Sequence, residues 1–208
     1  ANGGQTMAFT QQTFTPGTAP YAGYEGKYFY QYAVTAAGSG NSYNQLKTRL
    51  EGARILAGQT ATVSFWAKGS ASYNITTVGY QNFGTGGSPS GSALAWSSGN
   101  LAVTTSWQRF SYSFTMPSVS GKTFGTAGND YIELYINMPT NQTSTTGIWG
   151  VQLEAGSVAT AFQTATGTIQ GELAACQRYL PAISGASNTI LGYAYSTTGS
   201  QIYIKLPT

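Results

Sequence analysis

Apolar and polar residues alternate along several short stretches of the chain, which is the pattern of β-strands with one buried face. The alternation is clearest in KYFYQYAVT (27–35), TATVSFWAKG (60–69), SWQRFSYSFTMP (106–117) and DYIELYINMP (130–139). In residues 60–69, for example, Val63 and Phe65 belong to one face and Trp66 belongs to the other. A helical pattern does not produce this alternation, so these stretches predict strands.

Turn-forming segments separate the predicted strands. Gly, Pro, Ser and Asn are concentrated in residues 16–26, 84–92, 118–129 and 140–147. Strands that follow one another with only turns between them favour an antiparallel arrangement. The sequence therefore predicts an all-β fold, an antiparallel β-sandwich or jelly roll, in which residues 51–58 form one helical turn.

The pattern changes near residue 164, where a Thr-rich bridge leads into a short amphipathic helix. Thr168 can cap this helix, Glu172 lies in its first turn, and Pro181 ends it. Its apolar residues recur at helical spacing: Ile169, Leu173, Cys176 and Leu180. The sequence thus predicts a sandwich over residues 1–163 and a bridge with one short helix over residues 164–181.

Residues 182–208 form a third predicted region, a C-terminal β-hairpin. It contains two strand-like stretches, TILGYAY and QIYIKLP, joined by STTGS. A lone hairpin of this size is not stable in water, because it buries too little apolar surface. It therefore needs support from the sandwich, from another copy of the chain, or from a further small β-region of which it is the start.

The chain is polar but nearly uncharged. Only 7% of its 208 residues are Asp, Glu, Lys or Arg, and the formal net charge is +3. The nine cations are spread from Lys27 to Lys205, so they form no dense basic patch, and we expect no nucleic-acid partner. Cys176 is the single cysteine and has no intrachain disulfide partner. No stretch has the apolar length of a membrane span, so membrane insertion is not expected either.

The sequence carries little that suggests catalysis. It has no histidine, which excludes mechanisms built on a histidine base. Two carboxylates could act on a sugar, but the neighbours Asp130 and Glu133 have an odd offset that sends them to opposite faces of one strand. Carboxylates that converge from distant strands stay open as an alternative. We expect no catalytic residue, no cofactor and no metal site, and hence no enzyme.

Aromatic and amide side chains near the Gly-rich loop at 84–92 are candidates for ligand binding. Aromatic planes stack on the apolar faces of sugar rings, and amides bind sugar hydroxyls, so these residues predict a glycan platform. The candidate residues are Trp66, Tyr73, Tyr80, Asn82, Phe83 and Trp96. The alternative is that a Trp or Phe fills the core, and for Trp66 the strand register decides between the two.

Three other aromatic features have structural interpretations. Tyr28, Tyr30 and Tyr32 share one strand face and predict a contact between subunits, because tyrosine combines a large apolar area with a polar tip. Trp107 and Trp149 are predicted to lie in the core.

Several of these segments also resemble a known group of proteins. In order, they are TRLEGARILAGQTATVSFWAKG, YQNFGTGGSPSG, TSWQRFSYSFTMPSVSGKTFGTAGNDYIELYIN, WGVQLEAGSVATAFQ and GELAACQRYL. Together they resemble tail-fibre and other virion structural proteins of tailed bacteriophages. Those proteins contain a jelly roll like that of carbohydrate-binding modules, followed by a helix of the ELALCQRYY type. The similarity runs from about residue 43 to the end.

The resemblance implies a structural protein of the virion, located in a tail fibre or another surface appendage. It implies attachment to the host through surface polysaccharide, contacts with neighbouring virion proteins, and assembly with other copies of the chain as a homotrimer. Two alternatives remain at this point. One is a carbohydrate-binding module of a secreted bacterial enzyme, and the other is a capsid-decorating or adaptor protein without glycan binding.

Overall fold

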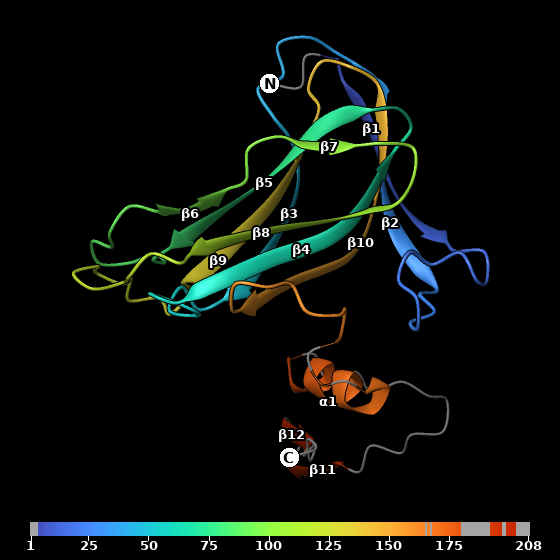
Figure 1. The fold of residues 1–208 in the computed structure, drawn as a ribbon. Coiled ribbons are helices and arrows are strands. Elements are labelled where there is room, and N and C mark those ends of the chain that lie inside the picture. Colours follow the sequence, from blue (N-terminus) through green and yellow to red (C-terminus); the bar gives the residue numbers. More distant parts are fainter. Residues whose placement is uncertain (1–3, 165, 167, 180–191, 197–198, 203–208) are drawn as a thin grey trace. The chain divides into compact units, whose positions relative to one another are not determined.

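A computed structural model describes residues 4–164, 166, 168–179, 192–196 and 199–202 (Figure 1). The chain divides into two compact units, Ala1–Phe162 and Gln163–Thr208. The first unit consists of two antiparallel β-sheets, and the second contains a short helix and a two-stranded hairpin. The prediction of an antiparallel β-sandwich with one short C-terminal helix and a hairpin is therefore confirmed. No helix among the described residues is long and apolar enough to cross a membrane.

The first sheet, here called sheet A, has five strands in the order β1-β2-β10-β4-β8. Their bounds are β1 (Thr6–Thr13), β2 (Tyr28–Ala36), β10 (Ser144–Ala155), β4 (Thr60–Gly69) and β8 (Gln108–Thr115). The β10–β4 register shifts between Trp149 and Gln152, where Gly150 has a φ of +62°. A positive φ suits glycine, which has no Cβ to clash with the backbone.

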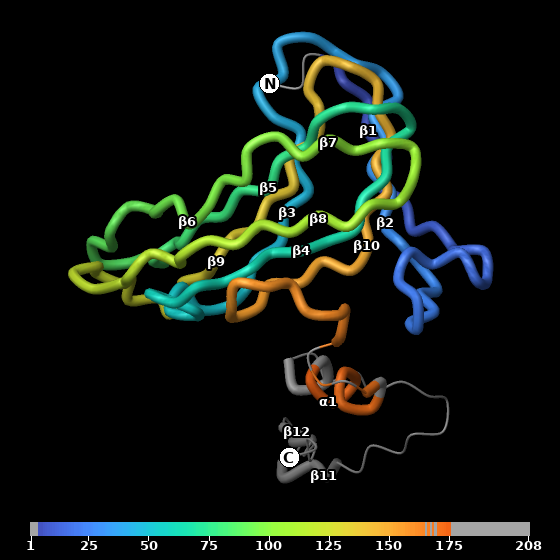
Figure 2. Tube along the Cα trace, viewed as in Figure 1, coloured from blue at the N-terminus to red at the C-terminus, as the bar shows by residue number. Residues whose placement is uncertain are grey.

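Sheet B also has five strands. Four of them follow the order β3-β9-β5-β6, and the fifth, β7, pairs with β5. Their bounds are β3 (Asn44–Glu51), β9 (Tyr131–Met138), β5 (Tyr73–Asn82), β6 (Ala93–Ser97) and β7 (Leu101–Val103). From β2 onward the chain crosses between the sheets at every connection except those that join β5, β6 and β7 (Figure 2). This crossing pattern is that of a jelly roll.

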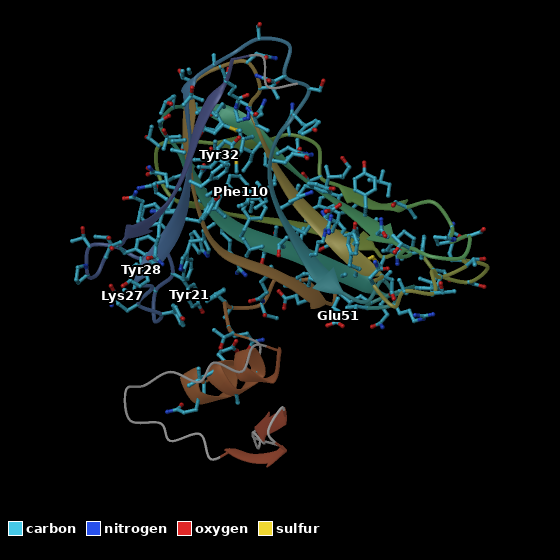
Figure 3. The ribbon with its side chains drawn as sticks, turned by 180° about the vertical axis from the view of Figure 1, so that it is seen from behind. Tyr21, Lys27, Tyr28, Tyr32, Glu51 and Phe110 are labelled. Atoms are coloured by element: carbon cyan, nitrogen blue, oxygen red, sulfur yellow. The ribbon has the colours of Figure 1, made fainter. Side chains whose placement is uncertain are left out.

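The core lies between the two sheets and follows the predicted alternation. From sheet A it receives Ala61, Val63, Phe65 and Ala67, and from sheet B it receives Ile132, Leu134, Ile136 and Met138, all of them buried. Tyr32 and Phe110 also lie between the layers (Figure 3). Because the Phe65 face is the core face, Trp66 lies on the outer face of sheet A. The structure thus settles the register that the sequence left open.

The tyrosines of β2 face the core instead of a neighbouring subunit. Tyr32 is buried, donates a hydrogen bond to Met7 Sδ (2.9 Å), and has its pKa raised by burial. Tyr30 packs against the same core, and only Tyr28, near the end of the strand, is exposed. The prediction of a subunit contact through all three tyrosines is therefore wrong, because Tyr32 lies in the core and Tyr30 packs against it.

Glu51 ends β3 and residues 53–58 form consecutive turns, so the predicted helical turn over residues 51–58 is also wrong. Ile55 N–H donates to Gly52 O (3.2 Å), and Ala57 N–H donates to Arg54 O (3.1 Å). Leu56 has a φ of +59°, which lies outside the right-handed helical region and prevents a regular helix.

The second unit begins its helix where the sequence predicts. The helix α1 spans Ile169–Tyr179, and Gly171 N–H donates to the Thr168 hydroxyl (3.0 Å), so Thr168 is the N-cap. Glu172 accepts hydrogen bonds from the backbone and hydroxyl of Thr166, and these bonds lower its pKa. The hairpin pairs β11 (Gly192–Ser196) with β12 (Gly199–Ile202). The predicted helix stop at Pro181 lies outside the described residues.

Candidate functional site

The outer face of sheet B presents a mixed aromatic and polar surface, here called the open face. Strand alternation places its residues on four neighbouring strands. They are Gln45, Lys47 and Arg49 from β3; Tyr131, Glu133, Tyr135 and Asn137 from β9; Thr76, Val78 and Tyr80 from β5; and Leu94 from β6. Tyr80 and Leu94 are exposed, and the side chains of Lys47 and Arg49 are 54% and 56% exposed.

Glu133 is the centre of the open face. Arg49 Nε donates to its Oε1 (2.9 Å), and Lys47 Nζ lies 3.5 Å from the same oxygen. The Tyr135 hydroxyl donates to the other carboxylate oxygen, Oε2. The carboxylate is therefore largely buried but fully engaged, which is the condition under which a charged group can lie in a sheet face.

These contacts also shift the acidities of the two partners. Burial by itself raises the pKa of Glu133, but the hydrogen bonds from Tyr135 and Arg49 and the nearby charge of Lys47 outweigh it, so the pKa lies below its usual value. Burial raises the pKa of Tyr135, and the hydrogen bond to the negative Glu133 raises it further. At neutral pH Glu133 is thus ionised and Tyr135 keeps its proton.

Three tyrosines supply the aromatic part of the open face. The Tyr80 ring meets the Tyr135 ring edge to face, with centroids 5.9 Å apart and an interplanar angle of 88°. The guanidinium of Arg49 lies 4.3 Å from the centroid of the Tyr131 ring. Since the rings of Tyr80 and Tyr135 are perpendicular, they form an angular surface that offers one ring face and one ring edge to a ligand.

Amide and hydroxyl groups continue this surface along the sheet. Gln45 Nε2 donates to Asn137 Oδ1 (2.9 Å), and Asn137 Nδ2 donates to Thr76 Oγ1 (2.9 Å). This chain of hydrogen bonds runs across β3, β9 and β5, perpendicular to the strands. Amides have two donors and two acceptor lone pairs, so they retain capacity for a polar ligand.

Only two of the six predicted site residues lie on this side of sheet B. Tyr80 is part of the open face, and Asn82 lies two residues further along the same strand face. Asn82 Nδ2 donates to Ser92 Oγ (3.0 Å), and its Oδ1 accepts a hydrogen bond from Gly84 N–H (3.0 Å). Asn82 thus fixes the start of the Gly-rich loop.

Trp96 and Phe83 lie in the interior, which corrects the expectation of a platform at these positions. Trp96 is 3% exposed, stacks on Phe114 with centroids 4.5 Å apart, and donates from Nε1 to Thr77 Oγ1 (3.2 Å). Phe83 is buried with its ring edge to face against Phe124 (5.3 Å). Neither ring has a face free for a sugar.

Tyr73 and Trp66 lie away from the open face. Tyr73 packs against the core, and its hydroxyl donates to Thr145 O (2.7 Å), which ties the start of β5 to β10. Burial raises its pKa. Trp66 lies on the outer face of sheet A, opposite Trp149 of β10. The six predicted residues therefore do not form one cluster.

Two segments of the chain fold over the outer face of sheet A, here called the covered face. Residues 14–27 bring Phe14 within 5.5 Å of Trp107 and 6.1 Å of Trp149, measured between ring centroids. Residues 156–162 bring Phe162 within 4.7 Å of Trp149. Glu154 holds the second segment, because it accepts hydrogen bonds from Thr160 N–H (3.0 Å) and from the Thr160 hydroxyl (2.7 Å).

A separate cleft of about 590 Å³ opens between the two sheets. Its walls are mainly apolar, and they include Tyr28, Tyr30, Leu46, Leu134 and Ile148. Its polar side chains are few, namely Gln11, Lys47 and Thr48, whereas the open face has a connected row of amides and hydroxyls. Among the described residues, no group of three or more His, Cys, Asp or Glu side chains is placed to hold a metal ion.

Most residues of the open face were not predicted from the sequence as site residues. They are Lys47, Arg49, Tyr131, Glu133 and Tyr135. A signal was present, because Tyr131, Glu133 and Tyr135 alternate with the apolar residues of β9. Tyrosines on the polar side of an alternating strand have no role in that strand's core. Such tyrosines are therefore candidates for ligand binding, as Trp66 and Trp96 were.

No protein-family model matches the sequence, and no curated protein matches it. Solved structures with a similar fold include a CBM4 carbohydrate-binding module, with 16% identity over 62% of this chain and 71% of that chain and a TM-score of 0.46. The CBM22-1 xylan-binding domain of Paenibacillus barcinonensis is 15% identical over 75% of this chain and 88% of its own, with a TM-score of 0.44.

A domain of bacteriophage CBA120 tailspike protein 4 is also similar in fold. It is 15% identical, with a TM-score of 0.42, and the match covers 72% of this chain but only 19% of the tailspike chain. These three similarities concern the fold alone.

Proposed function

We propose that the open face binds a glycan and that the protein is a structural module of a tailed-phage virion that attaches to host-surface polysaccharide. The observation that carries the glycan part is the composition of the open face: tyrosine rings beside a row of amides and hydroxyls that crosses three strands. Stacking on the rings and hydrogen bonding to the amides are the two interactions that sugars require.

The charges of this face favour a neutral sugar. Lys47 and Arg49 share Glu133, and Glu51 follows on the same face of β3 by strand alternation. Two cations therefore face two carboxylates, so the face has little net charge with which to attract an acidic sugar. We propose a chain of neutral sugars that runs along the strands, from the amides of Gln45 and Asn137 to the rings of Tyr135 and Tyr80.

The virion part of the proposal is supported by the order and spacing of the sequence segments that resemble tail-fibre proteins. We propose that the chain functions in an appendage as a homo-oligomer with neighbouring virion proteins and has no catalytic role. Immunogold labelling with an antibody against the chain tests this location on particles of the source phage or prophage. Label on the appendages supports the proposal, and particles without label contradict it.

A glycan array followed by titration calorimetry tests the binding site. The Tyr80→Ala variant removes the exposed ring of the open face, and we expect it to weaken binding about tenfold, in line with about 1.4 kcal/mol for one stacking contact. The matched control is Tyr28→Ala, which removes an exposed tyrosine of β2 in sheet A. Equal affinities for wild type and Tyr80→Ala, or equal losses in the two variants, would contradict this site.

A further inference from the structure

The strand β1 lies at the edge of sheet A, next to β2 (Figure 1). It pairs with β2 from Met7 to Thr13, and no strand among the described residues pairs with its other side. In the same ladder Phe14 N–H donates to Lys27 O (3.0 Å). Because donors alternate along an antiparallel strand, the N–H groups of Phe9, Gln11 and Thr13 point away from β2, toward the free side.

The other edge strands of the sandwich carry features that discourage further pairing, whereas β1 does not. The edge strand β3 contains Lys47, Arg49 and Glu51, and β8 contains Arg109. The remaining edge strands, β6 and β7, are only five and three residues long. By contrast, β1 is eight residues long and its sequence, TMAFTQQT, has no charge and no proline. Natural proteins protect free edges with charge, proline or short length, so β1 is suited to accept another strand.

Apolar side chains beside this edge are also left exposed. Phe9 is 53% exposed, although its ring meets Tyr32 edge to face with centroids 5.1 Å apart. Tyr28, which lies on the same face of the neighbouring strand, is 42% exposed. The core therefore does not extend to the β1 edge of sheet A. A strand added to this edge would cover the exposed part of the Phe9 ring.

We propose that β1 of one copy pairs antiparallel with β1 of a second copy about a twofold axis. This proposal names the contact for the self-association proposed above and rests on it, and it gives a dimer where the resemblance to tail-fibre proteins implies a homotrimer. An uncharged strand pairs with itself without like-charge repulsion, and a twofold contact requires a self-complementary surface. With Phe9 opposite its symmetry mate, the outward N–H groups of both strands meet carbonyls and the two rings lie on the same face of the extended sheet.

Sedimentation velocity of the full chain over a concentration series tests the proposal. Gln11→Pro removes one outward N–H while leaving the β1–β2 bonds intact, since proline is tolerated on an edge where its nitrogen faces solvent. Phe9→Lys removes the exposed ring and places a positive charge on β1, where it would face the same charge of the second copy. We expect the wild type to form a concentration-dependent dimer, and we expect both variants to need at least tenfold higher concentration for the same dimer fraction.

The matched control is Ser111→Pro on the free edge of β8. Met116 N–H donates to Gln59 O (2.9 Å) across the β8–β4 ladder, so the N–H of Ser111, an odd number of residues away, also points outward. We expect this variant to dimerise like the wild type. Circular dichroism establishes that each variant is folded, and if Gln11→Pro does not fold, Phe9→Lys decides the outcome.

The possible outcomes separate the two proposals. A wild type that stays monomeric at every concentration overturns both the β1 contact and self-association. An oligomer that both β1 variants retain overturns the β1 contact alone, and so does a wild-type trimer, which a twofold pair cannot form. Glycan affinity is measured on the same samples, and its presence or absence changes neither conclusion, because β1 and the open face belong to different sheets.

Discussion

The two outer faces of the sandwich both carry rows of aromatic residues, but only the face of sheet A is covered by other segments of the chain. On the covered face of sheet A, the large rings of Trp107 and Trp149 lie beneath Phe14 and Phe162. On the open face of sheet B, the rings are tyrosines, and the Tyr135 hydroxyl takes part in a network with Glu133. The rings that the chain covers are thus mainly Trp and Phe, and the rings that it leaves open are tyrosines.

This difference shows why aromatic content alone does not mark a binding surface. An exposed Trp or Phe ring keeps apolar surface in contact with water, which is unfavourable. On sheet A two distant segments bury this surface. On the open face, hydroxyls, amides and charged groups satisfy one another across the strands, so exposure costs little. A surface that needs no cover from its own chain is available to a ligand.

The largest expected effect comes from the covered face. Trp149→Ala removes a buried ring that contacts Phe14, Tyr24 and Phe162, so the two covering segments lose their common support. We expect the free energy of unfolding to fall by about 3–5 kcal/mol, the usual cost of truncating a buried Trp. Urea denaturation at neutral pH measures it. A loss below about 1 kcal/mol would show that the cover contributes little to folding.

The next effect concerns the carboxylate that holds the cover in place. Glu154→Ala removes the acceptor of both Thr160 bonds, and we expect a loss of about 1–2 kcal/mol, because hydrogen bonds to charged groups are stronger than neutral ones. Hydrogen exchange of residues 157–162 is expected to accelerate at least tenfold. Glu51→Ala, which removes an exposed carboxylate, is the control. Unchanged protection of residues 157–162 would mean that Phe162 alone anchors the segment.

A smaller effect is expected for the charged centre of the open face. Glu133 has a folded-state pKa below its reference value of 4.5. Its contribution to stability is therefore complete above about pH 4.5 and is lost as the pH falls through the lower folded-state pKa. We expect Glu133→Gln to cost about 0.5–1 kcal/mol at neutral pH, since Lys47 and Arg49 are largely exposed.

Denaturation of wild type and Glu133→Gln at several pH values checks the sign of this effect. The difference between the two proteins is expected to shrink below pH 4.5, the reference value for this carboxyl. The control is Glu51→Gln, for which the difference from wild type is expected to stay small at every pH. A difference that grows on acidification would contradict the lowered pKa of Glu133.

Local alternation was enough to predict the fold class and much of the core. The alternation in β4 and β9 placed Val63 with Phe65, and Ile132 with Leu134, on one face of each strand, because a strand alternates regardless of its neighbours. The structure then showed that these are the core faces. The helix start at Thr168 was likewise a local signal. Both depend only on residues a few positions apart.

The candidate site depended on contacts that local patterns do not contain. The β5–β6 register shifts between Gly79 and Tyr80, so the adjacent residues Ala95 and Trp96 are both buried. A Cβ on Gly79 would lie 2.1 Å from the Trp96 ring, which shows how closely the strand accommodates it. Alternation does not reveal such a bulge.

The identity of the open sheet also depended on distant segments. Residues 14–27 and 156–162 cover sheet A. No feature of β4 or β9 alone indicates which of the two sheets these segments cover. The sequence could therefore suggest Tyr80 as a candidate but not its association with Glu133 and Tyr135, which lie more than fifty residues further along the chain.

The smallest effect on stability is expected for Tyr80→Ala, and it sharpens the contrast with Trp149→Ala. Tyr80 is exposed, and its main ring contact is the edge-to-face pair with Tyr135, worth about 0.5–1.5 kcal/mol. Because the ring is exposed, we expect a loss at the low end of this range, about 0.5 kcal/mol, in the urea denaturation that measures Trp149→Ala. Such a result means that the ring is not needed to build sheet B, so a loss of glycan affinity in the same variant reflects direct contact. A loss of about 3–5 kcal/mol would instead make Tyr80 a structural residue and would remove the open face as an independent binding surface.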